Sequence, residues 1–272
     1  MASDDLPDDN NLIRNDWSVL REFTPARIGL GRAGTSLPTR VNLQFQLDHA
    51  RARDAVQAPL DVPALQAQLG AIGLVSQPVK SMAHDRRTYL QRPDLGRTLQ
   101  SADAGRLREQ WHGKTPWDIA ILVADGLSSL AVARHAAPLL QQLMPLLQAQ
   151  YRVAPVCVAE QGRVALGDDV GEALQAKLVL VLIGERPGLS SPDSLGIYLT
   201  WQPRRGRTDA DRNCISNVRP QGLDYAAAAQ TCAYLIAGAF KAGLSGVQLK
   251  DQSRVLENTA INAIPFLTNH QS

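Results

Sequence analysis

Unbroken apolar runs alternate with amphipathic stretches in the second half of the chain. Residues 117–126, 152–162 and 176–185 are rich in Val, Ile and Leu, and the last of them contains "LVLVLIG". Such runs are typical of strands that are covered on both faces, as parallel strands are. Residues 194–203 predict one further strand. The pattern therefore indicates a sheet with a buried centre.

Stretches with helical spacing separate the predicted strands. Between the first two strands, apolar residues recur three or four positions apart, and Ser128 or Ser129 is placed to cap the helix. Residues 167–177 predict a shorter helix that begins near two aspartates, where the helix dipole favours acids, and residues 224–243 predict a long amphipathic helix. This alternation favours right-handed crossovers. We expect an α/β fold with a Rossmann-like, mostly parallel sheet and flanking helices.

The first part of the chain predicts a different organisation. Residues 1–15 are rich in Asp and typical of a disordered acidic tail, whereas residues 16–115 predict a mainly helical region. The α/β domain then spans residues 116–250, and residues 251–272 form a C-terminal extension to which the sequence assigns no role. Within the helical region, we expect helices at residues 39–56, 62–74 and 92–111.

Composition narrows the class of protein. The 272 residues are 44% hydrophobic and 20% charged, which is ordinary for a soluble globular protein. No apolar run approaches the ~18 residues of a membrane span, and the acidic start does not resemble a signal peptide, so we expect a cytoplasmic protein. The net charge of +2 implies no strong attraction to nucleic acid. Three cysteines without a CxxC pair favour reduced thiols over disulfides or structural zinc.

Charged residues follow three of the predicted strands directly. They are expected at the carboxyl edge of the sheet, where open α/β sheets bind ligands. Polar, Gly-rich turns are also usual at that edge, so a binding site and an ordinary set of turns both remain open. The residues concerned are Asp125, Glu160, Arg163, Glu185 and Arg186.

The stretch "GLGRAG", residues 29–34, matches the G-x-G-x-x-G dinucleotide fingerprint. That fingerprint needs a buried strand before it and a helix opening within it, whereas here a Thr-Pro pair precedes and Pro38 follows. A close-packed irregular turn is the better interpretation. Its neighbours Arg27, Arg32 and Arg40 leave open a contact with an anionic group or another chain.

No self-contained catalytic constellation occurs in the sequence. P-loop, HExxH and GxSxG motifs are absent, and the five histidines form no ligand-spaced pair, so we expect neither catalytic residues nor metal ligands in this chain. Cys214 lies near Arg212, which could lower the thiol pKa, although a small buried hydrophobe is the simpler interpretation. For Val164, the residues alone indicate core packing.

Five motifs together resemble a known family. In chain order they are "TPARIGLGRAGTSLPTR", "LQRPDLGRTL", "VADGLSSLAV", "IGERPGLSSPDSLGIYLTW" and "DRNCISNV". They are similar to the small subunit of ethanolamine ammonia-lyase, an adenosylcobalamin-dependent enzyme. The resemblance runs from about residue 24 to residue 217, and the tail after Lys250 extends past the expected end of the family pattern.

The resemblance implies a shared cofactor site. Adenosylcobalamin is expected between this subunit and a large subunit whose (β/α)8 barrel binds ethanolamine and carries out the radical chemistry that yields acetaldehyde and ammonia. The family's cobalamin-binding positions correspond to Val164 in "QGRVAL", Glu185 in "IGERPG" and Cys214 in "DRNCIS". Since no D-x-H-x-x-G stretch is present, we expect the cobalt to keep its dimethylbenzimidazole ligand, the base-on form.

Two other kinds of function remain as alternatives at this point. The chain could be an independent nucleotide-binding α/β enzyme, which would turn over a substrate alone. It could also be a structural adaptor, whose assembly would not depend on cobalamin. Whether a bacterial microcompartment encloses the enzyme is left open by the sequence.

Overall fold

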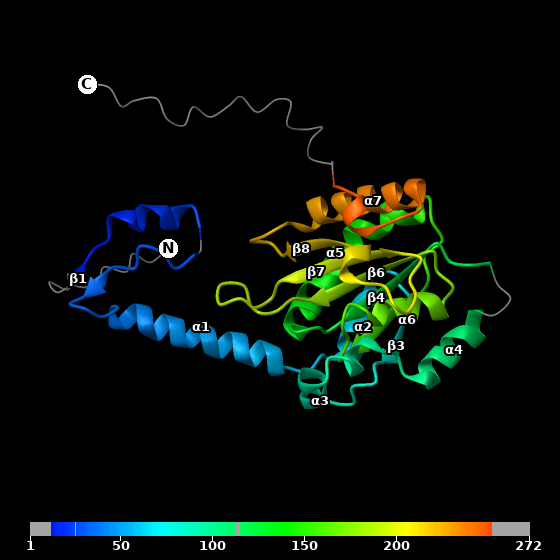
Figure 1. Cartoon of the computed structure of the whole chain (residues 1–272), viewed down its shortest axis with the longest axis horizontal. Helices are drawn as coiled ribbons and strands as arrows, with labels where there is room; N and C mark the ends of the chain where they lie inside the picture. The colour runs from blue at the N-terminus through cyan, green and yellow to red at the C-terminus, as the bar shows by residue number, and fades with distance from the viewer. Residues whose placement is uncertain (1–11, 25, 112–114, 252–272) are drawn as a thin grey trace, which may run out of the picture.

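The computed structural model describes residues 12–24, 26–111 and 115–251. Its centre is a six-stranded sheet with the strand order β3-β5-β4-β6-β7-β8 and with helices on both faces (Figure 1). β3 and β8 are therefore the edge strands. The strands are β3 (Ser76–Lys80), β4 (Ile119–Ala124), β5 (Val156–Glu160), β6 (Leu178–Gly184), β7 (Leu195–Trp201) and β8 (Arg212–Val218).

The sheet is mixed. β3, β5, β4 and β6 pair in parallel, whereas β7 is antiparallel to β6 and β8 is antiparallel to β7. The predicted α/β class with flanking helices is confirmed, but the parallel part ends at β6. Only residues 185–194 join β6 to β7, and a parallel crossover needs about a dozen residues or more. The short connection therefore turns the chain back alongside β6.

Helices cover the sheet in two layers. α5 and α7 pack on one face, where α7 reaches β7 and β8, and α6 packs on β4 and β6 from the other face beside α4. Alternate residues of β6 separate the two cores, with Leu180 and Leu182 facing α5, and Val181 and Ile183 facing α6. Ser128 caps α5 by accepting the N–H of Ala131 at 3.2 Å. These helices are α4 (Ser101–Trp111), α5 (Ser129–Gln148), α6 (Leu166–Ala173) and α7 (Tyr225–Ala242).

The N-terminal region is only partly helical. β3 comes from this region and joins the main sheet, a strand that the sequence did not predict. The helix expected from residue 92 begins only at Ser101, because residues 98–100 run beside residues 80–82: the N–H of Gln100 donates to the carbonyl of Lys80 at 2.9 Å. The remaining elements are β1 (Leu12–Ile13), β2 (Arg32–Ala33), α1 (Thr39–Gln57), α2 (Val62–Ala71), α3 (Arg86–Gln91) and the 3₁₀ turns Asp16–Glu22, Leu95–Arg97, Asp209–Asp211 and Gly246–Gln248.

The domain boundaries stay predictions. Residues 1–11 of the expected acidic tail and residues 252–272 of the C-terminal extension lie outside the described residues. Leu12–Ile13 pair with Arg32–Ala33 as a two-stranded antiparallel sheet. The domain boundary expected at residue 115 falls within one sheet, because β3 precedes it in the sequence and the other five strands follow it.

The Gly-rich stretch at residues 29–34 forms a close-packed irregular turn, as predicted. Gly29 and Gly31 adopt left-handed φ values of +58° and +72°, and a Cβ on Gly31 would lie 2.8 Å from the carbonyl oxygen of Ile13. Such a contact admits only glycine. The stretch contains the two-residue strand β2, and α1 begins only at Thr39. The strand-turn-helix context of a dinucleotide site is therefore absent from this described stretch.

Candidate functional site

The residues expected to bind a cofactor reach the same face of the sheet from three different elements. Val164 precedes α6 and packs against the core between α6 and the sheet. Glu185 directly follows β6, two positions after Ile183, which belongs to that same core. Cys214 of β8 is paired in register with Tyr198 of β7, which also packs against this core. The α6 face of the sheet thus carries all three.

Glu185 is held in place by two donors. Its Oε2 atom accepts the hydroxyl of Ser194, and it also accepts the N–H of Asn217 at 3.2 Å. A Cβ on Gly196 would lie 3.0 Å from Oε1, so the glycine leaves room for the carboxylate above β7. Arg186 is exposed and forms no ion pair with Glu185 among the described residues. The carboxylate is therefore fixed by the neighbouring strands and not by the adjacent arginine.

Cys214 differs from its sequence interpretation. The thiol is exposed, and so it is not a small buried hydrophobe. Desolvation by neighbouring groups raises the pKa of Cys214, the hydrogen bond with Tyr198 opposes this shift, and the charge of Glu185 adds to it. The expectation that Arg212 lowers this pKa is wrong, because the guanidinium of Arg212 is engaged elsewhere. Burial likewise raises the pKa of Tyr198.

A buried ion pair joins α6 to β8. The Nη1 and Nη2 atoms of Arg212 donate to the two oxygens of Asp168 at 2.8 and 2.6 Å, and Nη1 also donates to Thr200 at 2.8 Å. Both charged side chains are almost fully buried. Since Val164 lies just before α6 and Cys214 lies two residues after Arg212, this pair fixes two parts of the candidate site relative to each other. The sequence predicted only that Asp168 would lie near the start of a helix.

The charged residues predicted at the carboxyl edge do not converge on one point. Asp125 is buried: it accepts the N–H of Gly162 at 3.1 Å and an Nη1 hydrogen of Arg86 at 3.1 Å. Burial raises the pKa of Asp125 to about 6, while the charge of Arg86 opposes that shift. Arg163 lies over the ring of Tyr89, 4.4 Å from its centroid. Arg86 was missed, because its position on α3 carries no signal in the sequence.

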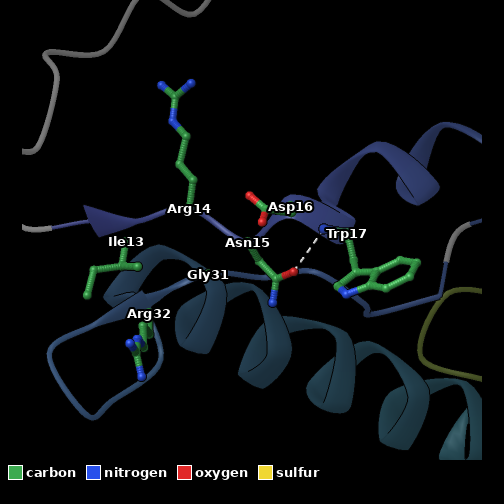
Figure 2. Close-up of a pocket in the computed structure, with 7 residues that line it drawn as sticks. All are labelled: Ile13, Arg14, Asn15, Asp16, Trp17, Gly31 and Arg32. Atoms are coloured by element: carbon green, nitrogen blue, oxygen red, sulfur yellow. Dashed lines mark hydrogen bonds between the residues drawn. The ribbon is translucent and has the colours of Figure 1, made fainter. Parts of the chain in front are cut away.

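Cavities of the described structure also occur near the N-terminal segment. One of about 420 Å³ is lined by residues 13–17 with Gly31 and Arg32. Figure 2 shows the side chains of Arg14 and Arg32 pointing away from each other, so they do not converge on one anion. Arg27 forms an ion pair with Asp48. Another cavity, of about 730 Å³, is lined mainly by this segment and α1, and also by Ser190.

The described residues contain neither a metal site nor a membrane-spanning helix. No group of three His, Cys, Asp or Glu side chains in residues 12–24, 26–111 and 115–251 could hold a metal ion. No helix in the same part of the chain is long and apolar enough to cross a membrane.

The fold defines an α/β protein in which an antiparallel extension continues a parallel sheet, and the three candidate residues lie on one face of it. Residues 14–250 match the family model described as "Ethanolamine ammonia-lyase light chain (EutC)", and the chain belongs to that family. The predicted resemblance is thereby confirmed. As expected, the tail after Lys250 lies beyond the matched range.

Similar curated proteins carry the corresponding name. A protein of Azotobacter vinelandii named "Ethanolamine ammonia-lyase small subunit" is 55% identical over 92% of this chain and 93% of its own length. A Ralstonia nicotianae protein with this name is 56% identical, with 93% of each chain covered. A Xanthomonas campestris protein of the same name is 57% identical over 88% of this chain and 89% of its own.

Proposed function

We propose that this chain is the small subunit of an adenosylcobalamin-dependent ethanolamine ammonia-lyase and that its α6 face forms one wall of the cobalamin site. A large subunit closes the site and converts ethanolamine to acetaldehyde and ammonia. The observation that carries the proposal is the family match over residues 14–250. The common face of Val164, Glu185 and Cys214 supports the position of the wall.

The residues on this face fit the chemistry of a corrin, an apolar ring edged by amide groups. The fixed carboxylate of Glu185 accepts hydrogen bonds from amide N–H groups, and Val164 offers an aliphatic contact. Gly196 has no side chain and therefore leaves space beside the carboxylate. When bound, adenosylcobalamin supplies the cobalt–carbon bond whose cleavage begins the radical chemistry. This chain orients the cofactor and excludes water from one side.

The base-on form belongs to the same proposal. The sequence lacks the D-x-H-x-x-G stretch with which a protein histidine replaces dimethylbenzimidazole. His135 is buried and bonded to the hydroxyl of Tyr225 at 2.8 Å, which supports a packing role for that ring. A cytoplasmic location is also part of the proposal, supported by the three free cysteines.

Glu185→Ala tests the wall directly. Hydrogen bonds to a charged group contribute about 1.5–3 kcal/mol, so adenosylcobalamin should bind the assembled enzyme about ten- to a hundredfold more weakly, at ~1.4 kcal/mol per decade. Ethanolamine affinity should change little. Arg186→Ala is the matched control, because it removes an exposed neighbour without a bond to Glu185. Cofactor titration followed by the visible spectrum measures the affinity.

The structure also gives Glu185 a local role, because Ser194 and Asn217 donate to it. Thermal unfolding of the isolated chain reports that role separately. If Glu185→Ala lowers the melting temperature while cobalamin affinity stays at the wild-type value, the carboxylate is structural and this contact is wrong. Turnover of ethanolamine by the isolated chain would contradict the division of roles between the subunits.

Thiol labelling provides a second test of the same wall. Of the three free cysteines, only Cys214 is exposed, so a thiol reagent should modify one group in the folded chain. The labelling rate should rise with pH, since the pKa of Cys214 is raised. Adding the large subunit with adenosylcobalamin should protect this thiol more than the large subunit alone. Equal labelling in all three states would contradict a cofactor contact at Cys214.

A further inference from the structure

The N-terminal arm, residues 12–57, carries an apolar surface that the rest of the described chain leaves uncovered. Of the fifteen large hydrophobic residues that are exposed in the described part of the chain, ten belong to the arm, so exposure of this kind is concentrated in one segment. Within residues 12–24 and 26–57, only Pro38 and Ala55 are buried. Such a concentration of exposed apolar side chains indicates an interaction site. The arm has almost no core of its own that would stabilise it in isolation.

The arm is anchored to the α/β body at its base. The Nε atom of Arg86 donates to the carbonyl of Val56 at 2.7 Å, and the hydroxyl of Ser129 donates to the carbonyl of Ala58 at 2.8 Å. Ala55 is buried at the same place. Figure 1 shows α1 projecting from this base away from the sheet. The body therefore presents the arm in a defined direction.

The two sides of α1 have different surroundings. On one side, Phe45 lies 5.2 Å below the guanidinium of Arg27, and Arg27 also pairs with Asp48. On the other side, Leu43 and Leu47 are one helical turn apart and are 58% and 45% exposed. The first side holds the N-terminal segment against α1. The second side is free to contact another chain.

Charge distinguishes between the possible occupants of this surface. Residues 12–57 contain seven Arg and four acidic residues, Asp16, Glu22, Asp48 and Asp54. Two such arms would repel each other, whereas a partner with acidic groups around an apolar patch would attract them. The charge therefore favours a different chain over a second copy of this one.

The position of the arm indicates which protein chain binds to it. Ser190, which lines a cavity together with α1 and the N-terminal segment, belongs to the β6–β7 connection that begins at Glu185. The arm thus lies beside the connection that leads away from Glu185 of the proposed cofactor face. We infer that the arm docks onto the large subunit, beside the cofactor site, against an apolar patch with acidic surroundings. This inference rests on the proposed function, which supplies the large subunit.

The double variant Leu43→Asp/Leu47→Asp tests the docking in the full complex. Each substitution puts a charge into the interface and removes apolar area, so association with the large subunit should weaken at least a hundredfold, about 2.8 kcal/mol at ~1.4 kcal/mol per decade. The matched control is Val75→Asp/Leu146→Asp, which changes two exposed apolar residues outside the arm and should leave association unchanged. Sedimentation velocity on mixed subunits measures both, and higher salt should weaken wild-type association.

Three results would overturn the inference. The first is wild-type affinity in the arm variant, and the second is an equal loss in the control. The third is a wild-type chain that dimerises alone and becomes monomeric in the arm variant while the complex forms normally, because a second copy then occupies the arm. Thermal unfolding should match wild type, since Leu43 and Leu47 are exposed. Glu185→Ala reports separately: if it leaves cobalamin affinity unchanged while the arm variant blocks association, only the proposed cofactor wall fails.

Discussion

The buried ion pair between Asp168 and Arg212 makes a quantitative prediction about stability. Arg212→Met removes the guanidinium but keeps most of the side-chain volume, which leaves Asp168 with 4% exposure and without its ion-pair partner. Breaking a buried pair from one side costs about 3–5 kcal/mol, because the remaining charge stays desolvated. For a chain of this size, ~1 kcal/mol corresponds to about 2–4 °C in melting temperature. The expected decrease is therefore about 6–20 °C.

Two further variants separate this mechanism from a general loss of packing. Asp168→Leu/Arg212→Met replaces both charges and should recover most of the lost stability, since two apolar residues of similar volume can be as stable as a buried pair. Arg205→Met is the matched control: Arg205 binds the neighbouring Asp169 at 2.8 Å, but its own side chain is 70% exposed. Arg205 is itself solvated, and the N–H of Leu99 still donates to the Asp169 carboxylate in the variant, so this control should lose less stability than Arg212→Met.

Urea unfolding and calorimetry at several pH values measure the unfolding free energy and the melting temperature of each variant. Burial already raises the pKa of Asp168, and loss of Arg212 removes the hydrogen bonds and most of the charge that oppose that shift, while the charge of Arg207 remains. A carboxyl whose folded pKa is raised favours the folded state at low pH, where it is protonated. The deficit of Arg212→Met should therefore shrink as the pH falls. A double variant as unstable as the single one, or equal losses in Arg212→Met and Arg205→Met, would refute the reasoning.

Two further predictions concern the carboxyl edge of the sheet. Gly184→Ala should prevent stable folding, because the new Cβ would lie 2.0 Å from the carbonyl oxygen of Ser128. In the control Gly105→Ala, the new Cβ in α4 meets nothing within 4 Å, so this variant should gain up to ~1 kcal/mol of stability. Thermal unfolding compares the two variants. Burial raises the pKa of Asp125 to about 6, so its contribution to unfolding free energy should fall as pH rises from about 4 to 6, by about 2–3 kcal/mol at 1.36 kcal/mol per unit. Subtracting the pH profile of Asp125→Asn isolates this contribution, and an unchanged difference between the two profiles would contradict it.

The covered part of the sheet could be predicted because its sequence signal is strong. β4, β5 and β6 are almost fully buried and read as apolar runs. β3 was missed because only Val79 of its five residues is buried and Pro78 interrupts the pattern. β8 was missed because its pattern is mostly polar on the α6 side, where the described helices leave Cys214 exposed. A strand with one open face loses the apolar run that identifies it.

The candidate site depended on different information. Strand-end geometry placed Glu185 at a ligand-binding edge, but the choice of Val164 and Cys214 came from resemblance to a family. The donors that fix Glu185 could not be found from the sequence, because Ser194 and Asn217 meet it only after β7 reverses direction and β8 pairs with it. The reversal of β7 depends on the short connection between β6 and β7, and the pattern of apolar residues carries no information about that length.

The edge strands also determine how this chain can associate. An edge strand offers unpaired N–H and C=O groups, to which a strand of another molecule can add. Pro78 removes one such donor from β3. At the other edge, the β7–β8 register shifts between Leu195 and Ile197, and Asn217 adopts a left-handed φ of 59°, which interrupts a regular ladder. Extension of the sheet from molecule to molecule is therefore disfavoured at both ends. The backbone thus protects the free chain against fibre formation and leaves specific recognition to its side chains.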